Sequence, residues 1–386
     1  MMQTISSFFC PTRIYMGALS YTQLSGFLAE FQCNRLFLAM DAALLQTEFA
    51  KSVLALLEKD NVTVSIFTEI EPDPSVRTVE KAFAQWRDAA SSAILAIGGG
   101  STIDVAKAVA ILATNGGRIH DYEGIERFKT PPLPLIAVPT TAGTGSEVSG
   151  SCVITDTERG VKMSIRHASL NPARIAILDP LALRTIPPKV ACHAGLDAFV
   201  HAFESFIAQN ANPLTDAVNL EAIRLISANL RPFVANPANQ DAALSMLCGS
   251  ALAGLAFGQT GLGNVHCMAR FVGARFHLSH GLSNALCLPT VAHFNMIAAP
   301  ARYAKIAAAM GCDVAHLPEL DAARTAVQAI AELCLDLDIP TQLRDVGVTE
   351  DSLEEMAQLC VEADYNRWNP RLTSLADFMS LFREAY

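Results

Sequence analysis

The chain has 386 residues, of which 51% are hydrophobic and 17% are charged, and its formal net charge at pH 7 is −10. This length exceeds what one hydrophobic core usually supports, so the sequence predicts two domains. The acidic balance and the lack of any Lys/Arg-rich run argue against nucleic acid and anionic membranes as partners, because both present phosphate groups that an acidic surface repels.

The cysteines indicate a reducing compartment. Ten of them are scattered singly along the chain, and no Cys-x-x-Cys spacing occurs. The sequence therefore predicts neither a zinc ribbon nor a thioredoxin-type pair, and the chain is too long for a disulfide scaffold. The first residues show no basic segment or cleavage site of a signal peptide. We expect reduced cysteines and a cytoplasmic location.

Strands and helices are predicted to alternate in the first half of the chain. Short apolar runs predict buried strands at 35–40, 62–67, 93–97 and 134–138. One helix is expected to begin with Asp73 as its N-cap and Pro74 at its first helical position, and another to cover about 102–113. Strands that alternate with helices in this way predict a parallel, doubly wound sheet.

The pattern changes near Ile186-Pro-Pro188, after which no strand alternation is found. We therefore expect an α/β domain over residues 1–187 and an all-helical domain over residues 188–386. The helices predicted in the second domain cover 190–208, 213–229, 241–257, 301–310, 320–337, 351–363 and 374–384.

One uncharged segment, residues 242–265, is long enough to cross a bilayer. Its many Gly, Ser, Gln and Asn residues are more typical of a tightly packed central helix of a folded domain. We expect no membrane span there.

Asp197, His201, His266 and His280 are the candidate metal ligands. Asp197 and His201 are four residues apart, so on a helix both side chains project from one face. His266 follows the long uncharged segment, where an unpaired imidazole would be costly to bury. One carboxylate and three imidazoles suit Fe(II) or Zn(II) and leave positions open for a substrate oxygen. The alternative is that some of these histidines are core or surface residues without a ligand role.

Two glycine-rich loops are candidate nucleotide sites. Gly98-Gly-Gly-Ser-Thr-Ile-Asp104 lies between a predicted strand and a helix, where backbone amides can approach a pyrophosphate. Pro139-Thr-Thr-Ala-Gly-Thr-Gly-Ser-Glu147 follows another strand and offers hydroxyl groups. Asp41 ends the first strand, where a carboxylate can bind a ribose and repel a 2′-phosphate, which favours NAD over NADP. The alternatives are tight turns for the loops and a simple cap for Asp41.

Taken in order, these segments resemble the iron-containing (group III) alcohol dehydrogenase family along nearly the whole chain. The matching motifs are Gly98-Gly-Gly-Ser-x-x-Asp104-x-x-Lys107, Pro139-Thr-Thr-Ala-Gly-Thr-Gly-Ser-Glu147, Lys162-Met, Gly195-Leu-Asp-Ala-x-x-His201, Asn212-Pro-Leu-Thr-Asp216, Gly261-Leu-Gly-x-x-His266 and His280-Gly-Leu-x-Asn-Ala285.

The resemblance implies a Rossmann-like N-terminal domain with a parallel sheet and an all-α, metal-binding C-terminal domain. It implies NAD(P)-dependent interconversion of an alcohol and its aldehyde or ketone, in a homodimer or larger homo-oligomer. It implies that one Fe(II), or Zn(II) as in some relatives, is bound by Asp197, His201, His266 and His280. Cofactor contacts are implied for Asp41, Gly98, Gly99, Gly100, Ser101, Asp104, Thr140, Thr141, Thr144 and Lys162.

Arg270 departs from the family pattern. Many relatives read His-x-x-x-His where this chain has His266-Cys-Met-Ala-Arg270. Arginine cannot shuttle protons, because it does not deprotonate in proteins, but its fork of donors can bind a carboxylate, sulfonate or phosphonate. We therefore include Arg270 among the candidate catalytic residues. The alternative is that it packs against the cofactor or a neighbouring acid.

We expect a metal-dependent oxidoreductase that interconverts a small primary alcohol and its aldehyde with NAD(H), chiefly by aldehyde reduction. One alternative is a reductase that uses Arg270 to select an anionic aldehyde. A lyase similar to dehydroquinate synthase is disfavoured, because the metal-site segments offer mainly Arg270 and Arg275 for a highly charged substrate. A non-catalytic nucleotide-binding protein is disfavoured by the intact set of candidate ligands.

Overall fold

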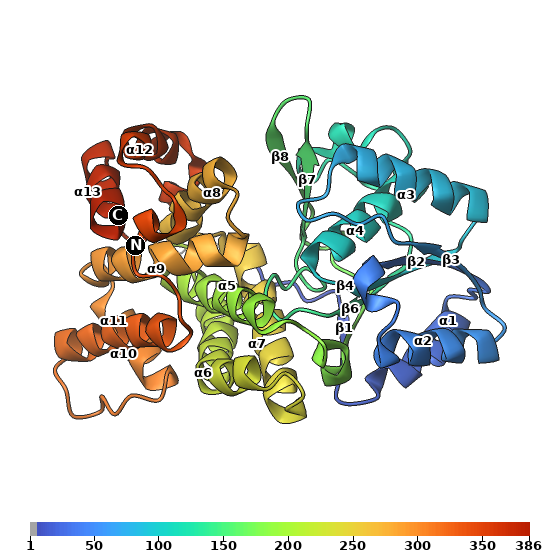
Figure 1. Cartoon of the computed structure of the whole chain (residues 1–386), viewed down its shortest axis with the longest axis horizontal. Coiled ribbons are helices and arrows are strands. Elements are labelled where there is room, and N and C mark those ends of the chain that lie inside the picture. Colours follow the sequence, from blue (N-terminus) through green and yellow to red (C-terminus); the bar gives the residue numbers. More distant parts are fainter. Residues whose placement is uncertain (1–5) are drawn as a thin grey trace. The chain divides into compact units, whose positions relative to one another are not determined.

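The computed structural model describes residues 6–386 and divides into two compact units (Figure 1). One consists of Phe9–Ile186 with Pro237–Leu247, and the other is built mainly from Pro187–Asn236 and Cys248–Tyr386. The first unit contains a parallel sheet covered by helices and the second is helical, which confirms the predicted fold class. The sequence analysis predicted domains of residues 1–187 and 188–386, which puts Pro237–Leu247 in the second domain. In the structure this segment groups with Phe9–Ile186.

The main sheet has six strands, all of them paired in parallel. The four strands predicted from apolar runs are all present in it. Its spatial order is β1 (Arg13–Met16), β9 (Ile175–Leu178), β6 (Leu135–Pro139), β4 (Ala93–Gly98), β2 (Arg35–Met40) and β3 (Thr63–Phe67).

Helices lie on both faces of this sheet. α3 (Val76–Ala89) and α4 (Gly100–Asn115) lie on one face, and α1 (Leu24–Glu30) and α2 (Glu48–Lys59) on the other (Figure 1). Two covered faces leave the strands no polar side, which explains why β2 and β4 are continuous apolar runs.

The start of α3 corrects one prediction. Its N-cap is Ser75, whose hydroxyl accepts from the Thr78 N–H at 3.3 Å. The predictions of Asp73 as the N-cap and of Pro74 as the first helical residue were therefore wrong, because both residues precede Ser75. Asp73 has a positive φ of 52°, a conformation that Asp tolerates better than most residues.

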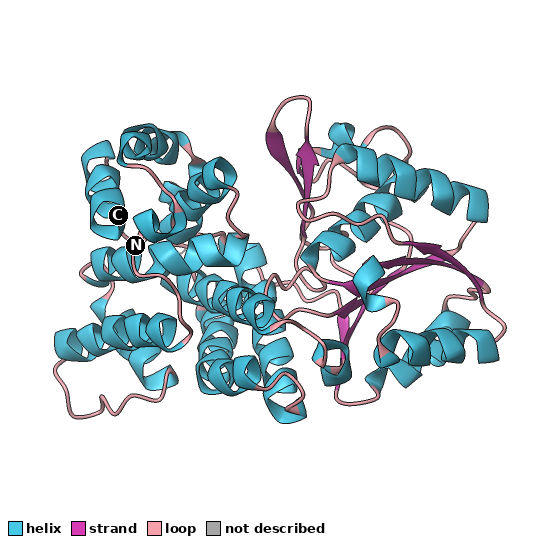
Figure 2. Ribbon diagram, in the orientation of Figure 1, coloured by secondary structure: helices cyan, strands magenta, loops and turns pink. Residues whose placement is uncertain are grey.

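A second, smaller sheet was not predicted. It contains β5 (Gly124–Ile125), β8 (Val161–Arg166) and β7 (Ser151–Asp156), and β7 and β8 form an antiparallel pair (Figure 2).

The second unit is built from helices (Figure 2). α5 and α6 each begin with a proline at the first helical position, where its missing N–H leaves no hydrogen bond unmade. Seven of the helices after residue 187 were expected, whereas α8 and α9 were not. The bounds are α5 (Pro188–Ile207), α6 (Pro213–Ala235), α7 (Gln240–Thr260), α8 (Asn264–Phe276), α9 (His280–Met296), α10 (Pro300–Ala309), α11 (Glu319–Asp336), α12 (Leu353–Glu362) and α13 (Leu375–Ala385).

By length and composition α7 could cross a membrane, and 61% of its most apolar 18-residue window is buried inside the protein. Burial of this kind is what a packed helix of a folded domain requires.

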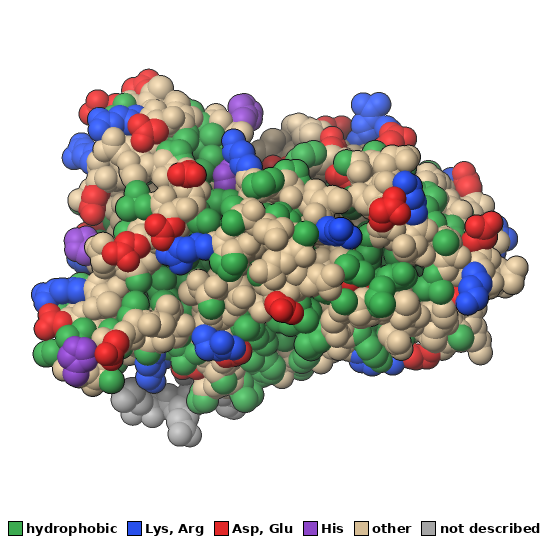
Figure 3. Space-filling model, turned by 60° about the horizontal axis from the view of Figure 1, so that its bottom comes forward, with side chains coloured by type: hydrophobic (Ala, Val, Ile, Leu, Met, Phe, Trp, Pro, Cys, Tyr) green, Lys and Arg blue, Asp and Glu red, His purple; other side chains and the backbone are tan. Residues whose placement is uncertain are grey.

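On the face shown in Figure 3, acidic and basic side chains are interspersed among apolar and neutral ones.

Candidate functional site

The four candidate metal ligands come together from three helices. Asp197 and His201 lie one turn apart on α5, His266 lies near the start of α8, and His280 is the first residue of α9. Each residue offers one ligand atom, and these atoms all lie within 4.8 Å of one another. The Nε2 atoms of His266 and His280 lie 3.7 and 3.6 Å from Asp197 Oδ1. The arrangement joins residues that are up to 83 positions apart in the sequence, from 197 to 280.

The cluster is buried on one side and open on the other. Asp197, His201 and His266 are buried, whereas 48% of the His280 side chain is exposed. Burial alone would raise the pKa of Asp197, but the neighbouring imidazoles of His201, His280 and His266 hold it well below its usual range. The carboxylate therefore stays ionised, as a metal ligand must.

Glu204 is a functional residue that the sequence analysis missed. It is buried on α5, and its Oε2 lies 2.7 Å from His266 Nδ1 while its Oε1 accepts from the Val265 N–H at 2.6 Å. Because Nδ1 is the nitrogen that faces Glu204, Nε2 is the nitrogen that faces the cluster. The signal was available, because Asp197, His201 and Glu204 have helical i, i+4, i+7 spacing.

The same carboxylates control the charge of His266. Burial lowers the pKa of this imidazole, but the nearby Asp197 and the hydrogen bond with Glu204 outweigh that effect and raise it to about 9. A metal bound at Nε2 has to displace a proton that the site holds firmly. We therefore expect metal binding to weaken as the pH falls.

Two glycines permit the close approach of these helices. A Cβ on Gly281 would lie 2.0 Å from the carbonyl oxygen of His193 on α5. A Cβ on Gly263, the N-cap of α8, would lie 2.9 Å from Asn369 Oδ1 and 3.1 Å from Glu204 Oε1. Larger residues at these positions would push His280 and His266 away from α5.

The two glycine-rich loops pack against each other in the α/β unit. β4 runs into Gly98, and α4 begins at Gly100 with Gly99 as its N-cap and no side-chain capping bond. A Cβ on Gly100 would lie 2.8 Å from the Thr144 side chain. The amides at the start of α4 and its positive dipole end are groups that could hold a phosphate.

The loops lie where a doubly wound sheet binds its ligands. The chain passes from β2 to β3 on one side and then to β4 on the other side of β2. Such a reversal leaves a crevice at the carboxyl ends of β2 and β4. Asp41 follows β2 there, and its Oδ1 accepts from the Ala43 N–H at 2.9 Å as the cap of a short 3₁₀ helix. The capping role of Asp41 is thus present, and it leaves the second carboxylate oxygen for a ligand.

The remaining cofactor candidates fall into two groups. Ser101, Thr140, Thr141 and Thr144 belong to the two packed loops or the first turn of α4. Asp104 instead accepts from Ser146 Oγ at 2.6 Å and from the Val153 N–H at 2.9 Å, and Lys162 on β8 forms an ion pair with Asp73 at 2.6 Å. These partners give Asp104 a structural role, and they place the Lys162 ammonium beside the Asp73 carboxylate, where two of its three hydrogens remain for other acceptors.

Arg270 is exposed on α8, one turn after His266. Its guanidinium lies 5.8 Å from the ring centre of Phe271, and within residues 6–386 no carboxylate forms an ion pair with it. The alternative that it packs against a neighbouring acid therefore finds no support in this structure.

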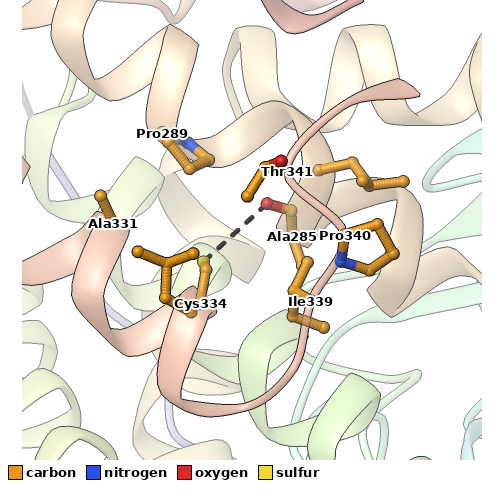
Figure 4. A pocket seen from close by; sticks show the side chains of 9 residues that line it. Ala285, Pro289, Ala331, Cys334, Ile339, Pro340 and Thr341 are labelled. Carbon is orange, nitrogen blue, oxygen red and sulfur yellow. Dashed lines mark hydrogen bonds between the residues drawn. The ribbon is translucent and has the colours of Figure 1, made fainter. Parts of the chain in front are cut away.

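A small apolar pocket lies elsewhere in the helical unit, between α9, α11 and the segment 339–341 (Figure 4). Cys334 lines it and donates to the Ala285 carbonyl at 3.9 Å, and burial raises the pKa of its thiol to about 12. The thiol is inert at that pKa, and none of the four candidate ligands lines the pocket. We do not assign the chemistry to it.

The donor set and the loops fit the groups that the sequence predicts. A buried carboxylate and three imidazoles within 4.8 Å of one another suit a divalent metal with an open position on the exposed side. The uncapped start of α4 beside Asp41 and the threonine-rich loop suits a dinucleotide.

Comparisons with known proteins agree with this reading. The family described as iron-containing alcohol dehydrogenase matches residues 11–180, and the C-terminal part of the Fe-containing alcohol dehydrogenase family matches residues 191–386. The chain is 40% identical over 333 residues to 1,3-propanediol dehydrogenase of Klebsiella pneumoniae, covering 86% of both chains. It is 33% identical to NAD-dependent methanol dehydrogenase of Bacillus methanolicus, covering 99% of this chain and 100% of the relative. The crystal structure of a 1,3-propanediol oxidoreductase superposes with a TM-score of 0.96 at 36% identity, covering 99% of this chain and 100% of the other.

Proposed function

This chain belongs to the iron-containing alcohol dehydrogenase family, and we propose that Asp197, His201, His266 and His280 hold its metal ion. It is an alcohol dehydrogenase whose cofactors are NAD and iron. The observation that carries the ligand assignment is the convergence of the four side chains, whose ligand atoms lie within 4.8 Å of one another. Zn(II) suits the same donors and is the alternative metal.

The proposed reaction interconverts a small primary alcohol and its aldehyde, chiefly as aldehyde reduction. Relatives named for 1,3-propanediol and methanol support a small substrate. A metal held at the cluster supplies Lewis-acid chemistry at the substrate oxygen, and NAD supplies the hydride acceptor or donor.

The chain's own residues prepare this chemistry. Glu204 holds the proton of His266 on Nδ1, so that Nε2 presents its lone pair to the metal. Burial of Asp197, His201 and His266 keeps water from one side of the cluster. The exposed ring of His280 marks the side from which a substrate can enter.

For the dinucleotide we propose that the start of α4 binds the pyrophosphate and Asp41 the adenosine ribose, with preference for NAD(H). The phosphate-binding group consists of Gly98, Gly99, Gly100 and Ser101. Thr140, Thr141 and Thr144 provide hydroxyls from the second loop. Asp104 fixes that loop through Ser146, and Lys162 can donate to the cofactor while it stays paired with Asp73.

We also propose a cytoplasmic protein that forms a homodimer or larger homo-oligomer and binds neither nucleic acid nor membranes. The net charge of −10 and the dispersed cysteines support the location and the exclusion of anionic partners. Light scattering of the purified protein tests the oligomeric state directly.

A second candidate function rests on Arg270, because its exposed guanidinium has no carboxylate partner within the described chain. A substrate carrying a carboxylate, sulfonate or phosphonate would provide one. In that case the enzyme reduces an anionic aldehyde.

The proposed function is tested by following NADH formation from propane-1,3-diol and other primary alcohols, and NADH consumption with the matching aldehydes. We expect activity in the Fe(II)-loaded enzyme, its loss after treatment with a chelator, and its recovery when Fe(II) is added. Full activity in metal-stripped protein would contradict the proposal.

A further inference from the structure

Asn284 contacts three of the four proposed ligands. It belongs to the motif His280-Gly-Leu-x-Asn-Ala285, but the sequence analysis gave it no role. It is fully buried on α9, one turn after His280. Its amide nitrogen lies 2.7 Å from Asp197 Oδ1, 3.2 Å from His266 Nε2 and 3.2 Å from His280 Nε2. One amide group therefore bridges side chains from α5, α8 and α9.

The amide nitrogen of Asn284 lies close to more than one partner. It carries two hydrogens, and Asp197 Oδ1 accepts one of them, whereas His266 Nε2 and His280 Nε2 accept only when they carry no proton. The amide oxygen is buried and has no hydrogen-bond partner within residues 6–386. A buried amide oxygen without a partner is costly, which points to a role for this side chain other than packing.

The contacts of Asn284 are compatible with a metal ion held by the same residues. A cation held by His266 and His280 would use their Nε2 lone pairs, and the amide would keep Asp197 Oδ1 as its acceptor. The amide thus keeps ligand atoms from three helices close to one another. This reduces the rearrangement that metal binding requires.

We propose that Asn284 is a positioning residue of the metal centre, which holds Asp197, His266 and His280 together before the metal binds and thereby sets the affinity for the metal. The proposal rests on the proposed ligand set. It adds that the affinity of the site for the metal depends on Asn284, which is not one of the four ligands.

The test compares Asn284→Ala and Asn284→Asp with wild type. Each purified full-length protein is stripped of metal, titrated with Zn(II) against a chromophoric chelator, and melted with and without Zn(II). We expect Asn284→Ala to weaken Zn(II) binding by about 10- to 100-fold, as for other residues that orient metal ligands. We expect Asn284→Asp to melt lower than wild type without metal, because two carboxylates would lie side by side, and to gain more from Zn(II) than wild type does.

Asn295→Ala is the matched control, because Asn295 is a fully buried amide on the same helix whose partner is Asn369. This variant should melt lower by the same amount with and without Zn(II) and keep the wild-type affinity. Wild-type Zn(II) affinity in Asn284→Ala would overturn the proposal. If Asn284→Ala does not fold, Asn284→Asp decides alone, because a residue needed only for packing predicts that Zn(II) raises the melting temperature of this variant by no more than it raises that of wild type.

This outcome is distinct from a failure of the ligand assignment. Wild-type protein that binds no Zn(II) would contradict the four ligands themselves. Tight binding by wild type with no effect of Asn284→Ala would leave the ligands in place and remove only the role of Asn284.

Discussion

At the scale of single residues, the proposed metal site depends both on the four side chains that would bind the metal and on side chains that orient them. Glu204 orients His266 and also accepts from the first amides of α8, so one carboxylate fixes both the ring and the helix that carries it. The sequence pattern identified the four candidate ligands because their types and spacing are distinctive. It did not identify Glu204, because a glutamate on a helix is ordinarily a solvated surface residue.

Arg270 gives a prediction about substrate choice. If an anionic substrate pairs with its guanidinium, aldehydes that carry a carboxylate, sulfonate or phosphonate should be preferred over neutral ones of equal size. A charge-assisted contact of about 1.5–3 kcal/mol corresponds to roughly a ten- to hundredfold preference in kcat/KM. Arg270→His should remove the preference and keep activity on neutral aldehydes. Equal kcat/KM for both classes in wild type would show that Arg270 does not select the substrate.

Asp41 gives a prediction about the cofactor. Its carboxylate both caps the 3₁₀ helix and is placed to repel a 2′-phosphate. Asp41→Asn keeps the capping oxygen and removes the charge, so it separates the two roles. We expect wild type to prefer NADH, and Asp41→Asn to gain activity with NADPH while its melting temperature stays unchanged. A wild-type preference for NADPH would refute this role of Asp41.

At the scale of elements, long apolar runs were predicted well and short or interrupted ones were not. β2 has the predicted bounds, and β4 and α4 lie where expected. A long apolar segment indicates a buried element clearly, because few other structures bury all of its side chains. β1 and β9 have four residues each, too few to show a period. α9 contains Pro289, which in a sequence normally indicates a helix end.

The loop after β6 gives a prediction about pH. Glu147 is buried there, and burial raises its pKa to about 7, opposed in part by its own backbone amide and Lys107. A carboxyl group with a raised folded-state pKa binds its proton more tightly in the folded chain. Its contribution to stability is therefore greatest at low pH and is lost as the pH rises from about 4.5 to about 7.

Glu147→Gln removes this titration. We expect the variant to gain stability over wild type between pH 5 and pH 8 by up to about 3 kcal/mol, measured by urea unfolding of the metal-free protein. Glu158→Gln is the control, because Glu158 is exposed and should show no such change. The same difference between Glu147→Gln and wild type at both pH values would rule out a raised pKa of Glu147.

At the scale of the whole molecule, composition and alternation predicted an α/β part followed by a helical part. The assignment of Pro237–Leu247 to the first unit was not predictable, because it depends on contacts in space and the segment has no distinct composition. The metal cluster likewise depends on α8 and α9 reaching α5. The sequence supplied its residues through motif spacing, and the folded structure supplied their convergence.

The central claim is that one divalent metal per chain is held by Asp197, His201, His266 and His280. The most direct measurement is the metal content of wild type, His266→Ala, His280→Ala and the exposed control His316→Ala after loading with Fe(II) or Zn(II) and removal of free metal. We predict one metal per chain in wild type and His316→Ala, and strongly reduced metal content with matching loss of activity in the other two variants. Full metal occupancy in both His266→Ala and His280→Ala would contradict the account.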